Sequence, residues 1–151
     1  MIIRIARWEI EIDPVQTAAC YAGTIESNPC QCDDCRNFRA AAHLAFPEAF
    51  REFASSIGID ISKPAELCHY GSAGEPCPTS GWFHLVGTLR SGQDAWTETS
   101  PNTSLLDSEP AFGLKGIGFT TEIALLPDSF ENYPVVQLEF ETMVPWILDK
   151  Q

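Results

Sequence analysis

Alternating hydrophobic and polar residues mark the strands that the sequence predicts. Trp8, Ile10 and Ile12 alternate with acidic residues, and Pro14 ends that pattern. The same period of two recurs in two stretches nearer the C-terminus, and further segments read as strands by their composition. We therefore expect strands at 8–12, 17–21, 66–70, 82–89, 117–125 and 136–144.

A longer period predicts two helices between the early and late strands. Phe46, Phe50, Phe53 and Ile57 are spaced so that they share one face of a helix, and Gly58 suits its end. An earlier helix is expected over 37–44, with Asp33 or Asp34 as its N-cap. Pro47 separates the two helices, since proline suits a first helical turn better than a helix interior.

The order of these elements predicts an α+β fold. Segments 71–81 and 91–116 are rich in glycine, proline and hydroxyl residues, which is typical of loops. Successive strands without helices between them favour antiparallel pairing. We expect one domain over 1–151, with an antiparallel sheet of about five or six strands and two short helices packed on one face.

Charge narrows the classes of partner. The formal net charge is −12 and charged residues make up 20% of the chain. Nucleic acids and anionic membranes attract basic surfaces, so we expect neither as a partner. A basic protein is the expected partner, bound through Glu9, Glu11, Glu139 and Glu141 on the polar faces of strands. Charged residues soon after Met1 argue against a signal peptide, and the expected location is the cytoplasm.

The strongest chemical signal is a C-x-C-x-x-C cluster formed by Cys30, Cys32 and Cys35. Zinc takes about four cysteine or histidine ligands in a tetrahedron, and the x-x spacing suits chelation. In a reducing compartment, clustered thiols favour metal binding over disulfides. We predict a zinc site with His84 as the fourth ligand, and the alternatives for that place are Cys77, Cys20 and His43.

Two other interpretations of the same cysteines stay open, namely redox or nucleophilic chemistry and cysteines without a ligand. The carboxylates of Asp33 and Asp34 would raise the pKa of neighbouring thiols, which weakens a nucleophile. The favoured function is a non-enzymatic binding or regulatory domain with a structural zinc site. The alternative is an enzyme that uses the cysteine loop as a catalytic metal or thiol redox site.

Several motifs together resemble a known group of sequences. They are C-x-C-x-x-C-x-N-F from Cys30 to Phe38, the G-W-F-H strand from Gly81 to His84, and Pro145-Trp146 near the C-terminus. In this order they resemble a family of small uncharacterised bacterial proteins. The resemblance implies a single bacterial domain, and it brings no activity or cofactor with it.

Overall fold

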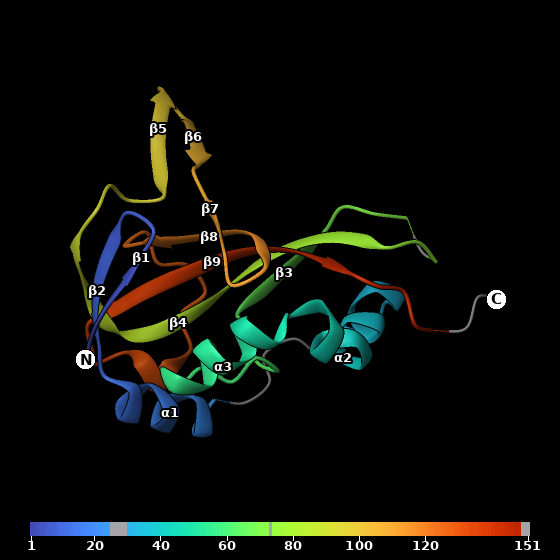
Figure 1. The fold of residues 1–151 in the computed structure, drawn as a ribbon, viewed down its shortest axis with the longest axis horizontal. Coiled ribbons are helices and arrows are strands. Elements are labelled where there is room, and N and C mark those ends of the chain that lie inside the picture. The colour runs from blue at the N-terminus through green and yellow to red at the C-terminus, as the bar shows by residue number, and fades with distance from the viewer. Residues whose placement is uncertain (25–29, 73, 149–151) are drawn as a thin grey trace.

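Helices lie along one side of an antiparallel sheet, and a two-stranded hairpin projects from the other side (Figure 1). A computed structural model describes residues 1–24, 30–72 and 74–148. The elements are β1 (Ile2–Ile5), β2 (Trp8–Ile12), α1 (Pro14–Ala22), α2 (Asp33–Ala45), α3 (Glu48–Ser56), β3 (Glu66–His69), β4 (Cys77–Ser91), β5 (Trp96–Ser100), β6 (Thr103–Leu106), β7 (Glu109–Ala111), β8 (Leu114–Thr120), the 3-10 turn η1 (Asp128–Phe130) and β9 (Val135–Val144). The predicted α+β class is confirmed.

The sheet is built around the long pair β4 and β9. Its hydrogen-bonded order is β1-β2-β4-β9-β8-β7, β3 also pairs with β4, and β5 and β6 form a separate hairpin. The sheet thus has seven strands within the described residues, slightly more than expected. All pairs are antiparallel, as consecutive strands without intervening helices predict.

Phenylalanines join the helices to the sheet. Phe50 in α3 and Ile57 at its C-cap are fully buried, as predicted for this helix face, whereas Phe46 is also buried but lies outside α3, at the C-cap of α2. The ring of Phe46 lies 5.1 Å from that of Phe140 on β9 and 5.9 Å from that of Phe83 on β4. Burying one such side chain contributes about 1.5–3 kcal/mol, so this aromatic cluster is a substantial part of what holds the helices to the sheet.

The strand predicted at 17–21 is wrong, because these residues belong to α1. Asp13 is the N-cap, and its side chain accepts a hydrogen bond from the Gln16 N–H at 3.0 Å. Pro14 occupies the first turn, where its missing N–H costs nothing. This start signal outweighs the β-propensity of Thr17 and Tyr21.

Helix α1 covers a stretch of the β4 edge with which no strand among the described residues pairs. β2 and β3 pair with different parts of this edge and leave residues 83–86 between them. The Tyr21 hydroxyl accepts from the His84 N–H at 3.0 Å and donates to the His84 carbonyl at 2.8 Å. Thr17 Oγ1 accepts from the Val86 N–H at 3.0 Å. Two side chains of a helix therefore replace the missing strand.

This arrangement makes the Thr17 hydroxyl important for stability. Thr17→Val has nearly the same shape, but it leaves the buried Val86 N–H without its acceptor. We expect a loss of about 1–3 kcal/mol in the free energy of unfolding, measured by urea denaturation. Thr17→Ser keeps the hydroxyl and should be the milder change. Equal stability of the valine and serine variants would contradict this role.

Other element boundaries differ from the sequence predictions. The N-cap of α2 is Cys32 and not Asp33 or Asp34, which lie in the first turn. The strand expected at 117–125 ends at Thr120. Strand β1 was not predicted, β4 begins inside the expected loop at 71–81, and β5, β6 and β7 lie in the expected loop at 91–116.

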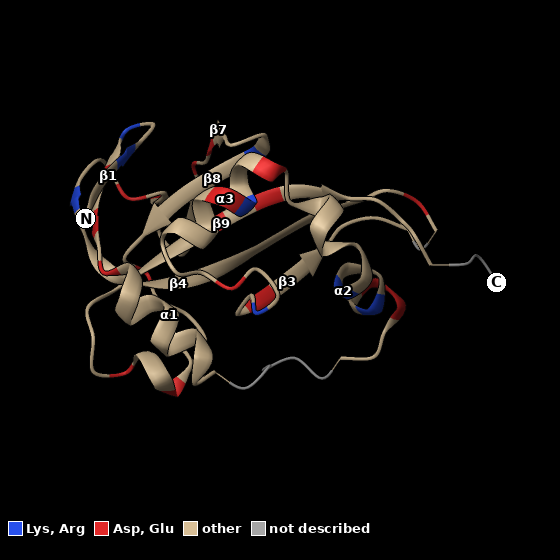
Figure 2. Ribbon diagram, turned by 60° about the horizontal axis from the view of Figure 1, so that its bottom comes forward, with Lys and Arg blue, Asp and Glu red and all other residues tan. Residues whose placement is uncertain are grey.

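The four glutamates expected to form one acidic surface do not lie together. β4 separates β2, which carries Glu9 and Glu11, from β9, which carries the other two. Glu9 pairs with Arg4 and Glu11 pairs with Arg90, while Glu139 is only 4% exposed. Figure 2 shows acidic residues spread over several elements. A basic partner stays a prediction, without this surface to support it.

Candidate metal centre

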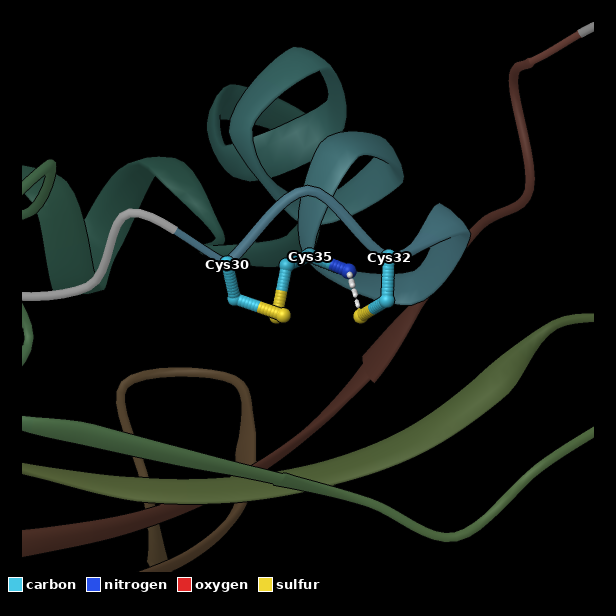
Figure 3. A group of neighbouring side chains, drawn as sticks. All are labelled: Cys30, Cys32 and Cys35. Atoms are coloured by element: carbon cyan, nitrogen blue, oxygen red, sulfur yellow. Dashed lines mark hydrogen bonds between the residues drawn. The ribbon is translucent and has the colours of Figure 1, made fainter.

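The N-terminal end of α2 positions the three cysteines. Cys32 is the N-cap, and its Sγ accepts from the Cys35 N–H at 3.4 Å. Cys35 is buried, Cys30 is half-buried and Cys32 is exposed. The three Sγ atoms all lie within 4.8 Å of one another. Figure 3 shows the side chains directed from this end of α2 toward the strands.

Asn37 holds this end of α2 against the C-terminal segment. Its side-chain N–H donates to the Pro145 carbonyl at 3.0 Å, and its Oδ1 accepts from the Ile147 N–H at 2.8 Å. Asn37 is 1% exposed, so these bonds are shielded from water. The asparagine of the cysteine motif thus meets the proline of the C-terminal motif, which gives the thiols a fixed support.

His69, at the end of β3, is the histidine that the structure brings to the cysteines. Its Nε2 lies 3.9 Å from Cys35 Sγ, and its Nδ1 lies 3.1 Å from Thr79 Oγ1. The Thr79 hydroxyl donates its proton to the Cys77 carbonyl at 3.2 Å, so it accepts from His69 Nδ1–H. This assignment leaves a lone pair on Nε2, directed at the thiols.

His84 does not belong to this group. Its ring is 1% exposed and its Nε2 lies 3.0 Å from Gln137 Oε1. The Gln137 amide donates through Nε2 to Glu139, so its oxygen accepts and His84 Nε2 carries a proton. His84 is also five residues along β4 from Thr79, which is about 16 Å in an extended strand. The structure therefore gives no support to His84 as the fourth ligand.

The alternative fourth ligands also lie in other surroundings. The Cys20 thiol donates to the Ser129 carbonyl at 3.2 Å, and the Cys77 thiol donates to the Pro78 carbonyl at 3.5 Å. His43 is exposed on α2. Across 1–24, 30–72 and 74–148, the only group of mutually close metal ligands is the cysteine trio.

Burial and hydrogen bonding separate the pKa values of these groups. Burial raises the pKa of the Cys35 thiol to about 12, and the hydrogen bonds that this thiol donates to the Cys32 and Cys30 side chains add to the rise. Hydrogen bonds, first of all from the Cys32 backbone, lower the pKa of the Cys30 thiol. Burial lowers the pKa of His69 although Asp34 opposes the shift, so its imidazole is neutral at pH 7. A neutral imidazole is the form that binds a metal.

One buried oxygen near the cluster has no protein partner. Asp34 Oδ1 is buried, and it accepts no hydrogen bond from the part of the chain that the structure describes. The positive end of the α2 dipole offsets part of the cost of this carboxylate. A cation held by the neighbouring thiols would offset more, so the orphaned oxygen is consistent with a metal here.

Sequence reasoning found the three cysteines and missed His69. The cysteine spacing is a local signal, whereas His69 lies 34 residues from Cys35 along the chain. The usable signal was the short strand ending at His69, because its pairing with β4 places Cys68 and His69 beside Ser80 and Thr79. Within the described residues, which include all six cysteines, no disulfide forms, so no thiol is withdrawn from metal binding in that way.

Within the residues described, no helix has both the length and the apolar character needed to cross a membrane. The resemblance to a family of small bacterial proteins stays a prediction. Comparisons of the chain with protein-family models, curated proteins and solved structures found no match.

Proposed function

We propose that this chain is a non-enzymatic binding or regulatory domain stabilised by one structural zinc ion. The ligands in this proposal are Cys30, Cys32, Cys35 and His69. The observation that carries it is the meeting of three thiols within 4.8 Å with an imidazole Nε2 that lies 3.9 Å from Cys35 Sγ.

The distance between Cys35 and His69 suits a shared zinc ion. In a tetrahedral site with ordinary zinc bond lengths, two sulfurs are about 3.8 Å apart, and a sulfur and a nitrogen are about 3.6 Å apart. The observed distance of 3.9 Å between Cys35 Sγ and His69 Nε2 is close to this. The bond from His69 Nδ1–H to Thr79 supports the proposal further, because metal-bound histidines usually donate their other N–H to a fixed acceptor.

A closed set of four protein ligands supports a structural role over a catalytic one. Zinc in this position would tie the start of α2 to the end of β3. The chain between Cys35 and His69 includes α3, so one metal bond would close a long loop around part of the core. Such a link stabilises the domain without any open coordination position for a substrate.

The alternative is an enzyme that uses the same loop. If His69 stays unbound, water would fill the fourth position and the zinc could activate it. A thiol mechanism has less support, since Cys35 is 7% exposed and the residue before it in the chain, Asp34, is acidic. Zinc binding by a His69 variant distinguishes a structural site with four protein ligands from a catalytic site with water in the fourth position.

The direct test is metal analysis of the purified protein, followed by the same measurement on Cys32→Ser. Serine is a good N-cap, so this variant keeps the helix start and removes only a metal ligand. We expect the bound zinc to be lost. The free energy of unfolding should fall by about 4 kcal/mol where free zinc exceeds the dissociation constant roughly a thousandfold.

Matched histidine variants identify the fourth ligand. His69→Ala should weaken zinc binding and alter the visible spectrum of the cobalt-substituted protein, because one nitrogen ligand is replaced. His84→Ala should lower the melting temperature but leave the metal in place, and Cys68→Ser should also retain it. A wild-type protein without metal, or Cys32→Ser with full metal and stability, would overturn the zinc site. Unchanged binding and spectrum in His69→Ala would move the fourth position to water.

A further inference from the structure

A second site lies on the face of the sheet that the helices leave free. Glu139 alternates along β9 with Leu138 and Phe140, so it points to the side opposite Phe46. There the β5–β6 hairpin rises from the sheet (Figure 1), and a cavity of about 440 Å³ lies beside it. Trp82, Trp96 and Glu139 are among its lining residues. Its volume is within the range of small-molecule sites.

Glu139 is a buried carboxylate with one oxygen free for a ligand. The residue is 4% exposed. Its Oε1 accepts from Trp96 Nε1 at 3.0 Å and from Gln137 Nε2 at 2.8 Å. Its Oε2 accepts no hydrogen bond from any residue that the structure describes. This oxygen is not one of the buried atoms that lack a partner, so it is accessible from the cavity that Glu139 lines, and a ligand there can reach it.

Hydrogen bonds hold the walls of the cavity in place. Trp96 is fixed through its ring N–H by Glu139 and through its backbone N–H by Asp94 Oδ1 at 2.9 Å. Trp82 donates from Nε1 to the Ala124 carbonyl at 3.0 Å. Gly118 lets the chain before β5 cross close to β8, because a Cβ there would lie 2.8 Å from Ala95 Cβ. The site is thus formed before any ligand binds.

The charges around the cavity select the kind of ligand. Glu98 and Glu122 line it together with Glu139, and none of its lining residues is a lysine or arginine, whereas Lys115 lines an adjoining cavity that also includes Glu139. Two indole side chains and three carboxylates attract an organic cation through ring electrostatics and charged hydrogen bonds. A hard metal ion fits less well, since it requires several oxygen ligands around one point. A neutral sugar would leave the buried carboxylate charge unbalanced.

We propose that this cavity binds a small organic cation, an alkylammonium or guanidinium group, with Glu139 as its counter-charge between Trp82 and Trp96. This site includes none of the cysteines, so it can be tested independently of the zinc proposal. The proposed occupant is a free small molecule. A lysine or arginine side chain of a peptide carries the same cationic groups, so the experiment below has to distinguish the two.

Glu139→Gln gives a sharp test. Glutamine keeps an oxygen to accept from Trp96 and Gln137 but removes the charge. Burial raises the pKa of the Glu139 carboxyl, which means that its ionised form is disfavoured in the folded protein. The variant should therefore melt at the same temperature as the wild type or higher, while it loses the cation. Stability retained together with binding lost is the signature of a functional charge.

Calorimetric titration of the full chain with choline and with n-butylguanidinium measures the effect. The neutral isostere of choline, 3,3-dimethyl-1-butanol, serves as the ligand control, and Glu131→Gln, on the surface outside the lining, serves as the protein control. We expect at least one cation to bind at millimolar concentration and its affinity to fall about tenfold or more in Glu139→Gln. Glu131→Gln should bind like the wild type.

Three results would overturn the proposal. They are no binding of either cation, equal binding of the neutral isostere, or unchanged affinity in Glu139→Gln. A lysine- or arginine-containing peptide that binds where both free cations fail would assign the surface to a protein partner and would also overturn it. The zinc proposal rests on other residues and is tested by Cys32→Ser. A failure of the cation proposal therefore leaves the zinc proposal intact.

Discussion

Phe50→Asp should leave the domain unfolded at 25 °C. Phe50 is fully buried, and its ring lies 5.2 Å from Phe46 and 6.4 Å from Phe83. Truncating a buried phenylalanine costs about 3–5 kcal/mol, and burying an unpaired carboxylate adds several more. Because domains of this size are stable by about 5–15 kcal/mol, the sum removes most or all of that margin. Circular dichroism should show no cooperative thermal transition.

Two variants separate this effect from simpler causes. Glu52→Asp places the same residue on the exposed face of α3, so it measures the poorer helix propensity of aspartate and should cost less than about 1 kcal/mol. Phe50→Leu keeps an apolar side chain of lower volume and should remain folded. A cooperative transition near the wild-type temperature in Phe50→Asp would show that α3 does not bury this face.

Gly58→Ala should cost about 2–5 kcal/mol in the free energy of unfolding, from left-handed backbone strain and steric overlap together. Gly58 has a φ of +86°, which only glycine adopts freely. A Cβ at this position would lie 2.3 Å from the Pro14 carbonyl oxygen and 2.8 Å from the Ala18 nitrogen. Both contacts are to the backbone of α1, so the residue after α3 cannot change without displacing α1. Urea denaturation measures the loss.

Gly23 provides the matched control at the end of α1. Its φ is −86°, and the nearest atom to an added Cβ is 3.7 Å away. Gly23→Ala should be neutral or slightly stabilising, since alanine restricts the unfolded chain. If both glycine variants behave alike, close packing of α1 against Gly58 is not the cause of the loss.

The parts of the fold predicted correctly are those set by short-range periodicity. β2 and β9 each present a buried face to one layer, so their side chains alternate in the sequence. The helix face through Phe50, Phe53 and Ile57 follows from a spacing of three and four residues. In these elements the local pattern and the tertiary packing agree.

The segment 17–21 shows where such patterns fail. Thr17 and Tyr21 have high β-propensity, and their hydroxyls do bond to a strand, but from a helix beside it. Only the cap at Asp13 and the proline after it indicate the helix. The loop-like composition of 91–116 was also misleading. β5 and β6 are largely exposed, so their sequences lack the alternation of hydrophobic and polar residues that marks a half-buried strand.

Part of the metal centre could likewise be predicted from the sequence, and part could not. Cys30, Cys32 and Cys35 are neighbours in the chain, so any fold brings them near one another. His69 and His84 both lie in strands, and their position in a strand does not rank one above the other. His69 lies near the cysteines because its part of the sheet faces the start of α2. The pairing of β3 with β4 places it there.

The contact of α1 with β4 also bears on self-association. An uncovered strand edge presents backbone groups that recruit strands from other molecules, the route by which sheets grow into fibrils. Here the Thr17 and Tyr21 hydroxyls and the Asp13 N–H, which donates to the Val86 carbonyl at 2.9 Å, already occupy the stretch of the β4 edge that pairs with neither β2 nor β3. α1 therefore blocks the addition of a strand from another molecule in the gap between β2 and β3.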